Sequence, residues 1–315
     1  MIEVKKKLPN GWFFILLHNK CEIRIMIPDI KNYDFKTGLP QEFEIVDLVE
    51  LYNEFKDTLT TIHRTGFYHI IWFQKSHPTH LVDFNPIRIK PNSLLFLNKD
   101  TVQRFDNKTN FQGKAILFTD SFFCKTEADT KFLRNNILFN DLFSVSQIQI
   151  DKQSNLFSEL LQQMRDELQN EKDNAQADIL KNLLHNFLLH SEREKRKQNF
   201  VELKKDANLD YVMIFKDLLE RNYKTQKQVS YYAKEMFISE KRLNQATSKL
   251  FGKTSKEIIN DRVMLEAKRI LAHTNESVKE ICYSLGFEEP TNFIKYFKKH
   301  SAITPIEFRE KNSVA

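Results

Sequence analysis

The sequence of 315 residues contains little glycine, proline and cysteine, and each scarcity excludes a class of protein. Gly occurs 6 times and Pro 8 times, which excludes collagen-like repeats and argues against disorder and glycine-rich phosphate loops. The three cysteines, Cys21, Cys124 and Cys282, lie far apart and form no CxxC pair. We therefore predict reduced thiols, and neither a disulfide framework nor a zinc cluster.

Long apolar runs are also missing. The run at residues 12–17 is far too short to span a bilayer, and no later stretch is longer. The first seven residues carry charges without the order of a signal peptide. We therefore expect a cytoplasmic protein that has no membrane partner.

The chain is long enough for two domains, and its apolar content is high. Hydrophobic residues make up 41% and Phe occurs 27 times, so a sizeable core is expected. The net charge of +6 is unevenly placed: from Phe200 onward 21 Lys and Arg face 16 Asp and Glu, which leaves +5 there and +1 elsewhere. The carboxy-terminal third is therefore the part suited to meet a polyanion.

Residues 40–150 carry short runs of β-branched and aromatic residues, separated by turn-forming residues such as Asn85-Pro86. This spacing predicts an all-β sandwich or barrel. In the run at residues 67–73, strand alternation separates two faces. One face carries Phe67, His69, Ile71 and Phe73, and the other carries Tyr68, Ile70 and Trp72. The pattern alone does not distinguish the inner face from the outer one.

Two leucine-rich stripes follow, at residues 156–168 and 179–188, with polar residues 170–174 between them. Their period of three and four residues predicts a pair of amphipathic helices within residues 151–190. These helices pack either on their own barrel or on the same helices of a second subunit. Leu160 and Leu184 are the residues whose substitution distinguishes these alternatives. The charged stretch 191–208 is predicted to be an inter-domain linker.

From about residue 210 the chain repeats itself. The first copy recurs 49 and then 50 positions later: Val229, Ala233, Met236 and Ile238 match Val278, Cys282, Leu285 and Phe287, and Leu243, Gly252 and Thr254 match Phe293, Ala302 and Thr304. Such self-similarity indicates two copies of one supersecondary unit. We predict two helix-turn-helix motifs, at about 227–251 and 277–300, joined by a helix over about 255–272.

Local signals support these boundaries. Ser239 and Ser277 are expected to cap helices, Gly252 to end one, and Gly286 to supply the positive φ of a turn. Pro290 suits the first position of the last recognition helix. In such motifs the second helix enters the major groove, and two units joined by one helix suit successive grooves about one turn apart.

Residues 278–300 (VKEICYSLGFEEPTNFIKYFKKH), with Ile303-Thr304-Pro305 and Phe308-Arg309 after them, resemble the signature of the AraC/XylS family of regulators. The resemblance extends over about residues 210–311 and implies a DNA-binding domain at 209–312. Three positions depart from the family pattern. Ala302 replaces the usual glycine, which implies a strained or rearranged helix end, and Thr247 and Cys282 replace a common aromatic residue and a common alanine.

Residues 63–73, 82–84 and 93–97 resemble the cupin-like sensory domain that many of these regulators carry. This resemblance implies a small barrel over residues 1–150 that binds an effector, with an arm at 1–40. The expected fold is α+β and multidomain: an amino-terminal cupin-like β-barrel with two flanking helices, and a carboxy-terminal all-α domain. The partners it implies are double-stranded promoter DNA, a small-molecule effector, a second subunit and RNA polymerase, and the expected role is that of an activator.

On the two recognition helices we expect the core to take Leu243, Ala246, Leu250, Phe293 and Phe297. The predicted DNA-contacting residues are Lys241, Asn244, Gln245 and Ser248 in the first, and Thr291, Asn292, Lys295, Lys298 and Lys299 in the second. Arg242 and Lys249 are expected to be exposed beside them. Asn and Gln can pair with adenine and Lys with guanine, while the flanking lysines suit phosphates.

Four histidines, His63, His69, His77 and His80, crowd the predicted barrel, yet no HxH spacing occurs. We therefore predict no metal and no cofactor, and no nucleophile–base pair or paired carboxylates indicate an enzyme. The effector-binding residues are not assigned by the sequence. Two alternatives remain: a metal-dependent cupin enzyme with an appended helical domain, and an effector-free regulator whose barrel only dimerises.

Overall fold

The computed structural model describes residues 5–7, 13–15, 31–35, 39, 41–75, 78–106, 112–139, 145–151, 153–198 and 207–312. These described residues fall into two compact units, one within residues 32–221 and 230–255 and the other within residues 1–31, 222–229 and 256–315. Among the described helices, none has the length and apolar character needed to cross a membrane.

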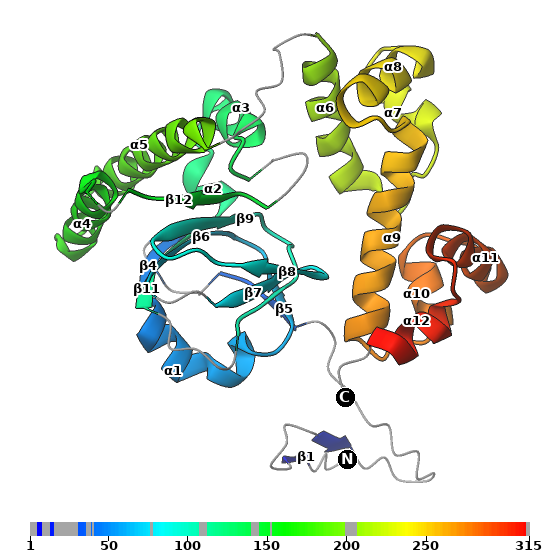
Figure 1. The fold of residues 1–315 in the computed structure, drawn as a ribbon, viewed down its shortest axis with the longest axis horizontal. Coiled ribbons are helices and arrows are strands. Elements are labelled where there is room, and N and C mark those ends of the chain that lie inside the picture. The colour runs from blue at the N-terminus through cyan, green and yellow to red at the C-terminus, as the bar shows by residue number, and fades with distance from the viewer. Residues whose placement is uncertain are drawn as a thin grey trace. The chain divides into compact units, whose positions relative to one another are not determined.

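Within its described residues the amino-terminal part contains two five-stranded sheets, most of whose strands are labelled in Figure 1. The first has the order β12-β9-β6-β11-β4, with bounds Gln147–Gln149, Ser93–Leu97, Tyr68–Lys75, Gln112–Phe118 and Phe43–Asp47. The second has the order β3-β5-β10-β7-β8, with bounds Lys31–Tyr33, His63–Thr65, Gln103–Arg104, Thr79–Val82 and Asn85–Arg88. A separate two-stranded ribbon pairs β1 (Lys5–Lys7) with β2 (Phe13–Ile15).

Strand β6 shows how the first sheet is buried on both faces. Its antiparallel register places Ile70 opposite Phe96 of β9 and Ile116 of β11. This row packs against helices, whereas the alternate residue Ile71 lies in a second core with residues from the other sheet, such as Val82. The predicted alternation of side chains is confirmed, and neither face of β6 is the outer one.

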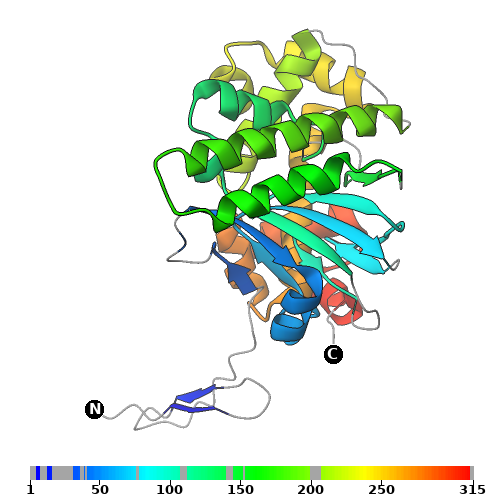
Figure 2. The same cartoon turned by 90° about the vertical axis from the view of Figure 1, so that its left-hand side faces the viewer.

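Helices α4 (Leu156–Gln169) and α5 (Gln176–Lys197) lie across the first sheet, as Figure 2 shows. Their leucine-rich stripes belong to the same apolar core as the sheet, and Leu160 and Leu184 are buried within it. Of the two packing partners that the stripes left open, the observed one is the chain's own sheet. A dimer contact through these helices remains a prediction, and such a contact would have to use side chains outside the two buried stripes.

Among the described residues, three helices interrupt the region that the sequence predicts to be all-β: α1 (Leu48–Leu59), α2 (Asp120–Phe123) and α3 (Glu127–Asn135). Each begins at a polar cap, for example Asp47, whose carboxylate accepts from the Val49 amide at 2.8 Å. Helix α1 is kinked at Phe55, where φ is −120° and ψ is 27°. The prediction missed these helices because short strands dominate the surrounding pattern.

The carboxy-terminal part is all helical over residues 207–312. Its helices are α6 (Ala207–Asn222), α7 (Val229–Glu235), α8 (Glu240–Phe251), α9 (Ser255–His273), α10 (Val278–Ser284), α11 (Pro290–Ser301) and α12 (Pro305–Asn312). The predicted helices of both motifs and the helix between them are confirmed. The predicted arm lies mostly outside the described residues, as do 199–206 of the predicted linker, so these domain boundaries remain predictions.

Candidate nucleic-acid interface and ligand cavity

Helix α8 is fixed at both ends by the residues that the sequence singled out. The Ser239 hydroxyl accepts from the Arg242 amide at 3.2 Å, and Gly252 ends the helix at φ +66°. Leu243 and Ala246 are fully buried, which defines the inner face of the helix. The predicted contact residues Lys241, Gln245 and Ser248 are exposed on the other side, together with Lys249.

Two polar side chains of α8 form hydrogen bonds with other residues of the protein. Asn244 is half-buried, and its Oδ1 accepts from the Ser255 amide at 2.9 Å, at the first residue of α9. Arg242 is also half-buried. Its guanidinium donates to Asn208 Oδ1 at 2.8 Å and lies 5.0 Å from the Tyr211 ring centroid. The prediction that Arg242 is exposed is therefore wrong, and the carboxamide oxygen of Asn244 is engaged in capping.

The turn between α10 and α11 leaves no room for a side chain at Gly286. Its φ is +69°, and a Cβ there would lie 2.1 Å from the Lys224 carbonyl oxygen. The Lys227 ammonium donates to the carbonyls of Lys224 (2.9 Å) and Gly286 (3.1 Å) and lies 4.6 Å from the Phe287 ring centroid. Partial burial lowers the pKa of Lys227. Sequence analysis did not identify this lysine as part of the turn.

Helix α11 presents one polar face and one apolar face. Pro290 occupies its first turn, and Phe293 and Phe297 are fully buried. The predicted contact residues Thr291, Asn292, Lys295, Lys298 and Lys299 are all exposed, as are Ile294 and His300. The helix contains no acidic residue, so these three lysines give its outer face an unopposed positive charge.

The chain leaves α11 through a strained residue. Ala302 adopts φ +65°, in the left-handed region, as its place in the repeat opposite Gly252 predicts. Helix α12 then starts with a reciprocal cap, in which the Thr304 amide donates to the Glu307 carboxylate at 2.6 Å and the Glu307 amide donates to the Thr304 hydroxyl at 3.3 Å. Helix α10 begins with the same device at Ser277 and Glu280.

Charged residues of α9 and α12 serve the framework of the second motif. Glu266 is buried between Arg269 (3.1 Å) and Arg262 (3.3 Å), and the Arg262 guanidinium lies 3.8 Å from the Tyr223 ring centroid. Arg309 donates to the carbonyls of Leu271 and Glu276. These side chains are bonded within the protein, so the positive charge available to a polyanion comes from exposed lysines instead.

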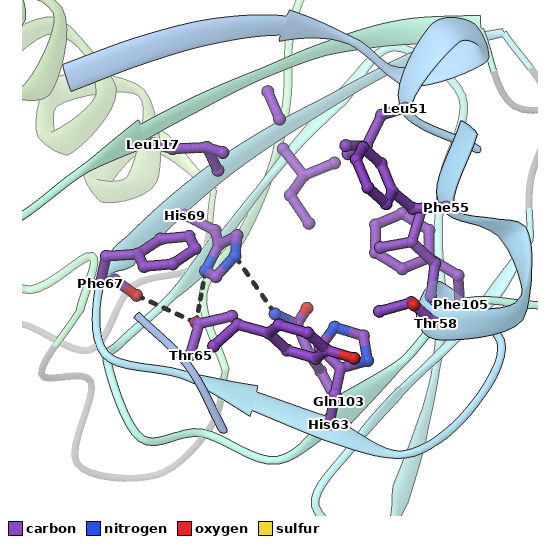
Figure 3. A pocket seen from close by; sticks show the side chains of 14 residues that line it. Leu51, Phe55, Thr58, His63, Thr65, Phe67, His69, Gln103, Phe105 and Leu117 are labelled. Atoms are coloured by element: carbon purple, nitrogen blue, oxygen red, sulfur yellow. Dashed lines mark hydrogen bonds between the residues drawn. The ribbon is translucent and has the colours of Figure 1, made fainter. Parts of the chain in front are cut away.

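A cavity of about 190 Å³ lies in the amino-terminal part, lined by α1 and by strands of both sheets (Figure 3). Its walls are largely apolar, and one side carries His63, Thr65, His69 and Gln103. Complete burial, with His63 and His80 nearby, lowers the pKa of His69 to about 3. Burial also lowers the pKa of His63, against the opposing effect of hydrogen bonding to backbone carbonyls.

Three of the four histidines that crowd this part of the sequence lie near one another in the structure. His63, His69 and His80 are buried close to Gln103, whereas His77 lies outside the described residues. Within the part of the chain that the structure describes, no three His, Cys, Asp or Glu side chains are grouped to hold a metal ion. The polar side of the cavity is therefore built from neutral imidazoles and a carboxamide.

Comparison with known proteins concerns mainly the carboxy-terminal part. Residues 232–311 match the family described as a helix-turn-helix domain. An uncharacterized HTH-type transcriptional regulator of Bacillus subtilis, YisR, is 30% identical over 92 residues, which cover 29% of this chain and 32% of that protein. The lactose operon transcription activator of Staphylococcus xylosus is 30% identical over 98 residues, which cover 31% of this chain and 35% of that protein.

A solved structure of ToxT from Vibrio cholerae aligns with 87% of this chain and 96% of its own, at 14% identity and a TM-score of 0.41. In the two sequence alignments above, by contrast, the chain spans about a third of the length of each relative. Residues 232–311 take in the tandem helix-turn-helix arrangement from within α7 onward, so this stretch is a helix-turn-helix domain similar to those of transcriptional regulators.

Proposed function

We propose that the chain is a transcriptional regulator of the AraC/XylS type, which binds promoter DNA through α8 and α11 and responds to a small-molecule effector. In this proposal the two sheets form a cupin-like sensory domain. A second subunit and RNA polymerase are its expected protein partners, and activation is its expected effect on transcription.

The outer face of α11 is the observation that carries the proposal. Buried Phe293 and Phe297 fix the rotation of the helix, so Thr291, Asn292 and Lys295 all lie on the exposed side. The first turns of a recognition helix contact base edges, which suits Asn292 for adenine and Lys295 for guanine or a phosphate. Lys298 and Lys299, one turn later, suit the phosphates that set the position of the helix on the duplex.

Helix α8 supplies the second recognition surface. Lys241, Gln245 and Ser248 are exposed, and Gln245 can pair with adenine through its carboxamide. Asn244 is a weaker candidate for direct base contact, because its oxygen already accepts from Ser255. We therefore assign base recognition in this motif to Gln245 first and to Asn244 second.

The effector site in this proposal is the cavity at His63, His69 and Gln103. It is concave and mainly apolar, with a few polar groups on one side, which is typical of small-molecule sites. Helix α1 contributes Leu51 and Phe55 to its wall, so a bound molecule would contact an element at the surface of the sheets. An effector shifts an equilibrium only by contacting two states differently, and in this proposal α1 is the element whose contact with the ligand would differ.

The test is DNA binding by the full-length chain and by single variants at several salt concentrations. We expect affinity to fall steeply with salt, and Lys298→Ala to weaken binding on all sequences while lowering the salt slope by about one. Gln245→Ala and Asn292→Ala should each lower discrimination at their own group of base pairs by about 1–3 kcal/mol.

Lys90→Ala is the matched control, because it removes one exposed positive charge from the sheet region. It should leave both affinity and salt slope unchanged. Salt-independent binding, or equal losses for the control and for Lys298→Ala, would show that α11 does not contact the duplex.

A further inference from the structure

The cavity in the sheet region has an unusual electrostatic character: no charged side chain lines it among the described residues. Its polar groups are those of His63, Thr65, His69 and Gln103, and Tyr33 and Thr58 also line the cavity. The two cavity imidazoles are neutral at neutral pH, because burial lowers the pKa of His69 to about 3 and lowers that of His63 as well. An ion brought into this cavity would lose its hydration without gaining a counter-charge, which is strongly unfavourable.

The polar side is a directed chain of hydrogen bonds, drawn in part in Figure 3. His80 Nε2 donates to Gln103 Oε1 at 3.0 Å, and Gln103 Nε2 donates to His69 Nε2 at 3.4 Å. His69 Nδ1 then faces the Thr65 hydroxyl at 3.5 Å, and that hydroxyl donates to the Phe67 carbonyl at 3.3 Å. This order requires His69 to be neutral, because its Nε2 accepts a hydrogen bond while its Nδ1 carries the proton. Burial lowers the pKa of His80 to about 4, so that ring is neutral at neutral pH as well.

Within this series of hydrogen bonds, Gln103 is the side chain that can form further hydrogen bonds with a ligand. A carboxamide has two N–H donors and two acceptor lone pairs, and the two bonds above use one of each. The side chain is 1% exposed, so water cannot freely satisfy the remainder. A ligand hydroxyl can either donate to or accept from such a carboxamide, whereas a carboxylate can only accept.

The size of the cavity limits the rest of the ligand. An apolar cavity of about 150 Å³ holds benzene, so about 190 Å³ has room for one six-membered ring and a short substituent. The walls present aromatic and aliphatic side chains, among them Phe67, Phe105 and Leu117. Phe55 lies at the kink of α1 and is 45% exposed although it also lines the cavity, which places its ring at the entrance.

We propose that the cavity binds an uncharged single-ring molecule that carries one hydroxyl group, of the phenol or benzyl alcohol class, with Gln103 as the group that recognises the hydroxyl. The proposal rests on the proposed function only in taking this molecule as the effector. Binding itself is measured without DNA, so the two claims fail independently.

The experiment is calorimetric titration of the full-length chain at neutral pH with benzyl alcohol, toluene and benzoate. All three probes contain one aromatic ring. Benzyl alcohol carries a hydroxyl group, toluene has a hydrogen in its place, and benzoate carries a negatively charged carboxylate. Benzyl alcohol should bind with a dissociation constant on the order of 1 mM or tighter, as expected for so few atoms. Toluene should bind about fivefold more weakly, for one hydrogen bond lost, and benzoate should not bind measurably.

Variants identify the site. Ala115 lines the cavity from β11, and Ala115→Leu should abolish benzyl alcohol binding because the added carbons occupy the cavity. Ile116→Val is the matched control, since Ile116 lies on the same strand but packs in the core under α4 and α5. Gln103→Leu should reduce the affinity for benzyl alcohol to that for toluene.

Three results would overturn the proposal: benzoate binding as tightly as benzyl alcohol, no heat from any neutral probe, or unchanged binding in a folded Ala115→Leu variant. Loss of DNA binding with benzyl alcohol binding intact would refute the proposed function alone. Intact DNA binding with no ligand binding would refute the ligand proposal alone.

Discussion

Replacing Ala302 by glycine should stabilise the end of α11. Ala302 and Gly252 occupy matched positions after the two recognition helices, with nearly equal φ of +65° and +66°. Their amides also make the same helical bond, to Lys298 and Ser248 at 2.9 Å. The two sites therefore differ mainly in the Cβ that Ala302 carries in the left-handed region.

The expected magnitude follows from two opposing terms. A left-handed conformation costs an L-residue about 1–2 kcal/mol, whereas glycine loses about 0.5–1 kcal/mol more conformational free energy on folding. The difference predicts that Ala302→Gly raises the local free energy of opening by about 0.5–1 kcal/mol. Hydrogen exchange of the α11 amides should then slow about two- to fivefold, while DNA affinity stays unchanged.

Gly252→Ala is the reciprocal variant. No atom lies within 4 Å of a Cβ built at Gly252, so the substitution adds backbone strain without a clash. Exchange at the end of α8 should become faster by a similar factor. If Ala302→Gly accelerated exchange, or if Gly252→Ala had no effect, backbone strain would not be the difference between the two helix ends.

Three further outcomes are expected from the structure. Asn244→Ala should destabilise the start of α9 by about 1 kcal/mol, whereas Asn244→Asp should keep the acceptor for the Ser255 amide and leave hydrogen exchange there unchanged. Gly286→Ala should destabilise the second motif by more than about 2 kcal/mol, because its Cβ would meet backbone, and a near-wild-type melting temperature would contradict this contact. Burial lowers the pKa of His69 to about 3 and that of His80 to about 4. As pH falls from 7 to 5, only the unfolded chain therefore takes up these two protons, and each histidine should lower the free energy of unfolding by about 2 kcal/mol. Denaturant midpoints that do not change with pH for this region would refute the burial argument.

Much of the carboxy-terminal part could be predicted from the sequence, because its signals are local. A serine cap, a glycine after a helix and an apolar period each act within a few residues. Ser239, Gly252 and Gly286 consequently have the roles predicted for them. The repeat doubled each signal, and the outward positions of α11 followed from the burial of Phe293 and Phe297.

The same local reasoning could not anticipate contacts between distant residues. Arg242 and Asn244 look alike as polar positions on an exposed helix face, yet one reaches Asn208 and the other Ser255. Phe237 holds the turn position that Gly286 holds in the second copy, at φ +54° and 95% exposed. Apolar character alone favours burial of a phenylalanine, and only the tertiary structure shows that this one lies outside.

The sequence by itself determined the two helix-turn-helix units, the alternation along β6 and the absence of an HxH spacing, because each depends on residues that are neighbours in the chain. Tertiary structure decided what covers each face of that strand: α4 and α5 on one, the second sheet on the other. It also brought His80, Gln103 and His69 together, from strands separated by up to 34 positions. Pairing across a sheet depends on register and packing, which a single sequence does not contain.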